Sequence, residues 1–192
     1  MSESSSTSSS KRLGRSDWLK AAITVMIESS VEQVRVERLA TILRTSKGSF
    51  YWHFKDRNDL LTAILEYWRE RSTFALTQRL AEIEPAPDRQ LLLFMELPVS
   101  SARASRAADL ELAIMGWARR SEEVRRAVAE VDQARTNHIA KLFARLGIPE
   151  ADATHRAHQA YAGLRYIAQR HDLDLEYRKR FIFSMHANLV NL

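Results

Sequence analysis

The sequence contains no cysteine, only 5 glycines and 4 prolines, and no apolar run long enough to cross a bilayer. Without cysteine there can be no disulfide and no thiolate chemistry, and we expect a cytoplasmic protein. A membrane-spanning helix needs about 20 consecutive apolar residues, so we expect no membrane partner. The scarcity of glycine and proline, with no long alternation of β-branched residues, argues against a β-rich fold.

Most of the chain is instead rich in alanine, leucine, arginine and glutamate, with apolar residues at helical spacing. This pattern predicts an all-α protein. Its 192 residues are enough for a substantial hydrophobic core. The formal net charge of +5 permits a nucleic acid or another anionic partner but does not require one.

The first residues, MSESSSTSSS, lack the charged-then-apolar order of a signal peptide and are expected to form a disordered tail. A basic arm, KRLGR, follows at residues 11–15. The arm either contacts nucleic acid or only adds solubility, and the sequence leaves both readings open.

Capping residues and helix breakers divide the rest of the chain. Ser16 and Asp17 are N-cap candidates, and Asp56 with Asp59 resembles a capping box. Gly147 before Pro149 is a helix stop signal. Together these signals predict helices over residues 17–28, 35–42, 46–52, 56–80, 88–96, 106–119, 121–146, 150–171 and 174–191.

The stretch RTSKGSFYWHFKD at residues 44–56 fits neither a core nor an ordinary surface. A core segment would not carry Lys47, His53 and Lys55 so close together, and a solvated surface would not carry a run of aromatics. We infer that a negatively charged partner covers part of it. Three short helices with a tight second turn suggest a helix-turn-helix, whose second helix lies in the major groove of DNA. The alternative is a helix corner packed on its neighbours.

Individual residues of this stretch can be given physical roles. Ser46, Lys47 and Ser49 lie at the start of the short helix, where they can meet bases or phosphates. Gly48 would allow DNA to approach the backbone closely. Tyr51, His53 and Lys55 are candidates for phosphate contacts, Phe50 and Phe54 are expected in the core, and Trp52 receives no assignment.

The run VRVERLA at residues 34–40, followed by SKGSFYWHF at residues 46–54, resembles the DNA-binding domain of the tetracycline-repressor (TetR-like) family of bacterial transcription regulators. The resemblance covers about residues 16–70. It implies a ligand-responsive repressor, not an enzyme, that binds a palindromic double-stranded DNA operator as a homodimer. It also implies a helix-turn-helix domain at residues 15–60, joined by a long helix to a helical ligand-binding and dimerisation domain within residues 61–192.

Two positions depart from the family pattern. The turn usually reads L-G-V, but here it is Leu43-Arg44-Thr45, and Arg44 would be strained by about 1 kcal/mol in a left-handed conformation. Ser30 stands where many relatives have glycine. The residues predicted to contact DNA are Arg35, Arg44, Thr45, Ser46, Lys47, Gly48, Ser49, Tyr51, His53 and Lys55.

The C-terminal part offers candidates for two further sites. Residues expected to line a pocket for an unidentified small-molecule effector are Phe94, Leu97, Leu112, Met115, Trp117 and Phe143. Residues expected at the dimer interface are Tyr161, Leu164, Ile167, Phe181, Phe183, Met185 and Leu189. The alternative for both sets is that they form the monomer's own core.

Other classes of function were considered. His155 and His158 stand three apart, as metal ligands can, but no third ligand or HExxH motif accompanies them, so we expect no metal and no cofactor. The chain lacks GxSxG and P-loop motifs. The second hypothesis is a helical protein-interaction module whose helix-turn-helix no longer reads DNA, and the Arg44 departure is its best support.

Overall fold

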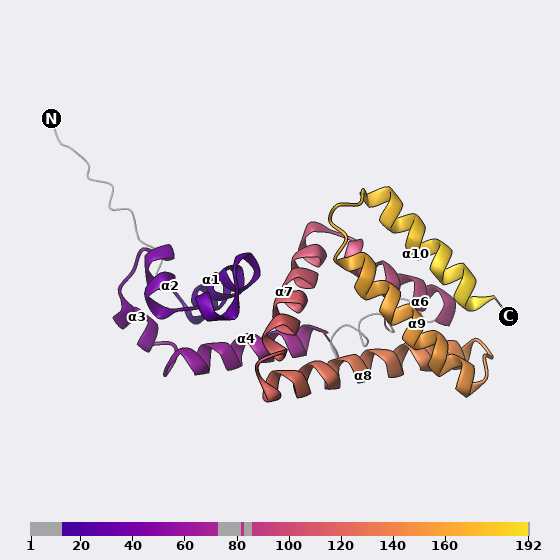
Figure 1. Cartoon of the computed structure of the whole chain (residues 1–192), viewed down its shortest axis with the longest axis horizontal. Helices are drawn as coiled ribbons and strands as arrows, with labels where there is room; N and C mark the ends of the chain where they lie inside the picture. The colour runs from indigo at the N-terminus through magenta and orange to yellow at the C-terminus, as the bar shows by residue number, and fades with distance from the viewer. Residues whose placement is uncertain (1–12, 73–81, 83–85, 192) are drawn as a thin grey trace.

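The computed structural model describes residues 13–72, 82 and 86–191 of the chain, and these residues are helical with no strand (Figure 1). The predicted all-α class is confirmed. The predicted tail up to residue 12 and the predicted continuation of the fourth helix to residue 80 lie outside the described residues. A small group of helices at one end is joined by α4 to a larger helical body, and α10 lies at the far end of that body (Figure 1).

The N-terminal group comprises α1 (Arg15–Glu28), the 3-10 turn η1 (Val31–Gln33), α2 (Val36–Ile42) and α3 (Lys47–Tyr51). Helix α1 starts earlier than predicted, because Gly14 is its N-cap and not Ser16 or Asp17. Asp17 serves the cap from inside the helix, since its Oδ2 accepts the Gly14 N–H at 2.9 Å. The carboxylate therefore caps the helix from its third position, as the acidic residue of a capping box does, while glycine offers no side-chain acceptor in return.

Helix α4 (Arg57–Ser72) begins as its sequence predicts. The Asp59 N–H donates to Asp56 Oδ1 at 2.9 Å, and Asp59 Oδ2 accepts the Lys55 N–H at 2.9 Å. Arg57 holds the start of α4 against η1, because its guanidinium donates to the carbonyl oxygens of Val34 (2.6 Å) and Val31 (2.7 Å).

The body contains α6 (Pro87–Glu96), the 3-10 turn η2 (Leu97–Val99), α7 (Ala102–Ala118), α8 (Glu122–Arg145), α9 (Glu150–Ala168) and α10 (Leu175–Val190). Helix α7 starts before its predicted residue 106, because the Ser101 hydroxyl caps it by accepting the Ala104 N–H at 3.2 Å. Gly147 has a φ of +87°, as a C-terminal glycine requires. The turn it forms separates α8 from α9.

The buried side chains form two clusters. The first runs through α1 to α4, with Trp18, Phe50 and Ile64 fully buried, and continues into α7 and α8 through Ile114 and Val124. The second lies within the body, between α6, α8, α9 and α10. The predicted boundary at residues 60 and 61 therefore crosses a continuous core, which ties the N-terminal helices to α7 and α8.

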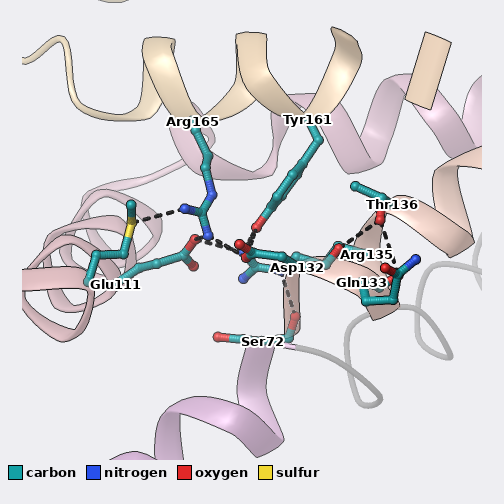
Figure 2. A network of polar contacts seen from close by, with 9 residues as sticks. Ser72, Glu111, Asp132, Gln133, Arg135, Thr136, Tyr161 and Arg165 are labelled. Atoms are coloured by element: carbon teal, nitrogen blue, oxygen red, sulfur yellow. Dashed lines mark hydrogen bonds and ion pairs between the residues drawn. The ribbon is translucent and has the colours of Figure 1, made fainter. Parts of the chain in front are cut away.

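A polar network lies where the end of α4 meets α7, α8 and α9 (Figure 2). Arg135 Nη1 donates to Glu111 Oε1 at 2.8 Å and to the Tyr161 hydroxyl at 3.0 Å, while its Nε donates to the Ser72 carbonyl at 2.9 Å. Arg165 completes the network by pairing with Glu111 (3.4 Å) and with Asp132. Two guanidinium groups thus face two carboxylates.

The balance of positive and negative groups in the network affects the pKa values of its members. Burial by itself would lower the pKa of Arg135, but the ion pair and hydrogen bond with Glu111 outweigh burial and raise that pKa above its ordinary value. Burial raises the pKa of the Tyr161 hydroxyl, which donates to Asp132 Oδ1 at 2.8 Å. The Arg135 guanidinium therefore stays charged and the Tyr161 phenol stays neutral at physiological pH.

Candidate nucleic-acid interface

The turn between α2 and α3 places Arg44 in the left-handed region, with a φ of +52°. The described residues contain no other non-glycine residue with positive φ. The Thr45 N–H closes the turn by donating to the Ala40 carbonyl at 3.0 Å. The turn therefore has the geometry for which the family uses glycine, and arginine adopts it at a cost of about 1 kcal/mol.

Helix α3 begins at Lys47, with Ser46 as its N-cap. The Ser46 hydroxyl accepts the Ser49 N–H at 3.3 Å. Gly48 follows in the first turn and is exposed. A Cβ atom at Gly48 would lie 3.6 Å from Ser46 Oγ, an ordinary contact. The fold itself therefore does not require glycine at this position.

An open hollow of about 400 Å³ lies between α2 and α3, lined by Glu37, Ala40, Thr41, Arg44, Thr45 and Lys47. Lys47 Nζ stands 3.4 Å from Glu37 Oε1, and both side chains are mostly exposed. A hydrogen bond from its own backbone, followed by the contact with Lys47, lowers the pKa of Glu37. Glu37 is therefore ionised at neutral pH, and sequence reasoning gave it no role at the site.

The aromatic run divides between the core and the surface. Phe50 and Phe54 are buried as predicted, and their rings stack at 5.5 Å. Tyr51 and Trp52 point outward, with 59% and 87% of their surface exposed. An indole so exposed contributes little to the fold. The sequence analysis assigned no role to Trp52. A helix of five residues is too short for its spacing to show which side chains point outward and which point inward.

Other predicted DNA-contacting residues surround α3. His53 is half-buried, and its Nε2 lies 3.1 Å from the Leu13 carbonyl, so one ring nitrogen already faces the start of α1. Arg35 is the exposed N-cap of α2, with its Nε donating to the Glu32 carbonyl at 3.3 Å. Lys55 is exposed at the turn before α4. Arg15, from the predicted arm, lies 4.6 Å above the Phe54 ring.

The residues predicted to line an effector pocket lie in different surroundings, and their role stays a prediction. Phe94, Leu97 and Phe143 belong to the core cluster of the body, whereas Trp117 packs against the cluster shared with the N-terminal helices. Leu112 is 46% exposed. The Met115 sulfur faces Arg165 Nη1 at 3.1 Å. Helical spacing shows that these residues are apolar, but it does not show which core each of them joins. The side chains of this set lie partly in two different cores and partly in solvent.

The predicted dimer residues also divide, and three of them need correction. Tyr161, Leu164 and Ile167 are buried in the core of their own chain, because this face of α9 packs against α8. Gly163, also in α9, lies against α10: a Cβ there would be 2.2 Å from Met185 Sδ.

On α10, Phe183 is 49% exposed. A groove of about 560 Å³ on α9 and α10 is lined by Gln159, Tyr177, Arg180, Phe181, Ser184, Met185, Asn188 and Leu189.

Fold and site together define a helix-turn-helix protein: α1, α2 and α3 form a small group that α4 joins to a helical body. Residues 19–64 match the family model of the bacterial regulatory proteins, tetR family. The resemblance stated from the sequence is thereby confirmed over these residues. The matched family and the similar structures are transcriptional regulators and not enzymes.

Solved structures with the same fold cover nearly the whole chain. A transcriptional regulator from Rhodococcus sp. Rha1 has a TM-score of 0.74 at 21% identity, covering 92% of this chain and 96% of that chain. The regulatory protein TetR from Rhodobacter sphaeroides has a TM-score of 0.67 at 22% identity, with coverages of 93% and 97%. The transcriptional regulator FadR from Bacillus subtilis, in complex with stearoyl-CoA, has a TM-score of 0.64 at 16% identity, with coverages of 92% and 97%.

A comparison with curated protein sequences found no match. None of the described helices is long and apolar enough to cross a membrane. Within the same residues, no group of three or more histidine, aspartate or glutamate side chains is arranged to hold a metal ion. His155 and His158, considered above as metal ligands, are exposed on α9.

Proposed function

We propose that the protein is a sequence-specific DNA-binding transcriptional regulator, acting in the cytoplasm as a ligand-responsive repressor. The observation that carries the proposal is the exposed face of α3, where Lys47, Gly48 and Tyr51 stand outward on a helix capped by Ser46. A lysine and free backbone N–H groups at a helix start suit base edges and phosphates. The exposed Trp52 extends this face toward the sugar edge of the groove.

Two copies would read a palindromic operator, with half-sites about 34–36 Å apart. The proposed dimer contact is the groove on α9 and α10, around Phe181, Ser184 and Met185. Exposed aromatic side chains on the same helices, Tyr166, Tyr177 and Phe183, favour burial against a second copy. Equivalent helices from two subunits would then form a four-helix contact across a two-fold axis.

An unidentified small-molecule effector would act through α4, which joins a reading domain at residues 15–60 to the regulatory body. Arg135 holds the last turn of α4 through the Ser72 carbonyl. Movement of α8 would therefore move α4 and change the separation of the two reading heads. By linkage, an effector that weakens DNA binding must bind more weakly to the DNA-bound protein.

The decisive experiment is fluorescence anisotropy with a labelled duplex taken from upstream of the protein's own gene. Lys47→Ala should lower operator affinity about 10-fold or more, while the matched Lys141→Ala, exposed on α8, should leave affinity unchanged. If two subunits neutralise six to ten phosphates, affinity should fall about 10³–10⁵-fold between 50 and 200 mM salt.

The competing function is a protein-interaction module. It would be favoured if an unlabelled scrambled duplex competed as well as the upstream duplex. Loss of helicity in Lys47→Ala would instead show that this lysine is structural. Unchanged affinity in a folded Lys47→Ala protein would contradict the assignment of α3 as the reading helix.

A further inference from the structure

Glu37 places a negative charge on the face that we assign to DNA. It lies in the first turn of α2, with its side chain 68% exposed, and it lines the same hollow as Arg44 and Lys47. A carboxylate near DNA repels phosphates, so its presence there lowers affinity for the backbone. A residue that opposes binding in this way needs a compensating role.

The fold gives Glu37 only a minor role: an acidic side chain in the first turn of a helix favours the helix dipole, and at an exposed position this effect is small. The carboxylate's ion pair is with Lys47 Nζ, 3.4 Å away, and exposed pairs of this kind add little to stability. Glu37 is exposed, whereas its neighbours Val36 and Leu39 fill the core. Glu37 is therefore available for a ligand that approaches the hollow.

The chemistry of the pair matches one edge of a base pair. An ionised carboxylate only accepts hydrogen bonds, and a lysine ammonium only donates them. In the major groove a G·C pair presents the guanine N7 and O6 acceptors beside the cytosine N4 donor. Because Glu37 and Lys47 stand side by side on α2 and α3, one such pair can satisfy both of them.

We propose that Glu37 is a specificity-determining residue that accepts a hydrogen bond from a cytosine N4 amino group, while Lys47 binds the guanine of the same base pair. This inference rests on the proposed function, because it requires that α3 enters the major groove. Away from the correct base pair, the carboxylate faces phosphates or base acceptors and disfavours binding. Specificity then comes from rejection of wrong sites as much as from attraction to the right one.

The test is selection of binding sites from random duplexes with the wild-type protein, Glu37→Ala and Glu37→Gln, followed by anisotropy on the selected site. Wild type should select a G·C pair under each reading head and lose about 10- to 100-fold in affinity when that pair is inverted to C·G. Both variants should lose most of this discrimination and bind a scrambled duplex several-fold more tightly. The matched Glu123→Gln, which removes an exposed charge on α8, should behave as wild type.

The outcomes separate the two proposals. If Glu37→Ala selects the same site with the same penalty for inversion, the role of Glu37 is overturned while the DNA-binding function stands. If the wild-type protein selects no sequence, both are overturned. Thermal unfolding of the variants, expected to match that of wild type because Glu37 is exposed, excludes misfolding as the cause of altered specificity.

Discussion

At the scale of single residues, Arg44 illustrates how local strain and charge compete at one position. Its φ of +52° is the conformation that glycine adopts most readily. Its side chain lies beside the hollow between α2 and α3, with Lys47 on the same rim. A guanidinium in that place adds positive charge where we propose that DNA binds. The resulting gain in DNA affinity would offset the cost of the left-handed backbone.

Replacing Arg44 separates these two effects. Arg44→Gly should raise the free energy of unfolding by about 1 kcal/mol, because it relieves the left-handed strain. Arg44→Ala keeps that strain and should not stabilise the protein. Both should weaken operator binding to a similar extent, since both remove the guanidinium. Urea denaturation and anisotropy measure the two quantities, and equal stability of the two variants would contradict the strain argument.

At the scale of elements, α3 is too short to be stable by itself. A helix of five residues depends on its cap and on packing, here the Ser46 hydroxyl and the buried Phe50 ring against Trp18 at 5.3 Å. The cap residue also lies on the face assigned to DNA. If α3 binds DNA as we propose, its start serves folding and recognition through the same atoms.

Substitutions at Ser46 distinguish the two roles. Ser46→Ala removes the acceptor for the Ser49 N–H and should destabilise the protein by about 1 kcal/mol. Ser46→Asp keeps an acceptor at the cap and favours the helix dipole, so stability should be retained. Its negative charge should nevertheless abolish measurable operator binding. Thermal melts measure the stability of the variants, and anisotropy measures their operator affinity. Tight operator binding by Ser46→Asp would contradict the proposal that DNA contacts this end of α3.

At the scale of the whole molecule, the N-terminal helices and the body share a core and a polar network. Arg120 Nη1 pairs with Glu32 Oε1 at 2.7 Å, and Arg106 Nη2 donates to Thr24 Oγ1 at 2.5 Å, so both ends of α7 contact the N-terminal helices. The network around Arg135 fixes the last turn of α4. These contacts give the body a physical means of positioning α4.

Breaking the network should therefore affect stability strongly. Glu111→Gln leaves Arg135 and Arg165 with one carboxylate between them and should cost about 3 kcal/mol, because it uncovers a buried charge. Glu122→Gln is the matched control: it breaks the exposed pair with Arg125 and should cost less than 1 kcal/mol. Denaturant titration of both variants gives the comparison, and equal costs would mean that the network is not effectively buried.

The proposed dimer contact can be tested at the same scale. Ser184→Arg places a long charged side chain in the groove on α9 and α10 and should yield monomers. Ala151→Arg, at an exposed position of α9 that does not line the groove, should leave the dimer intact. Sedimentation equilibrium reports the mass directly. A dimer that survives Ser184→Arg would place the interface on another face.

The sequence by itself determined the helical class, most helix boundaries and the family resemblance. Capping residues, prolines and helical spacing act over a few residues, so Ser46, Asp56 and Gly147 could be assigned before any tertiary contact was considered. The match over residues 19–64 confirmed the family resemblance for the same reason: a short recognition motif is local in the chain.

Only the tertiary structure decided which apolar faces are covered. Tyr161, Leu164 and Ile167 have the composition of an interface but are buried by the chain's own helices, and Trp52 is exposed although its neighbour Phe50 is fully buried. Glu111 and Arg135 lie on different helices, so no pattern in the neighbouring sequence could predict that they pair. Helical spacing specifies that a face is apolar, whereas the packing of α7, α8, α9 and α10 specifies what covers it.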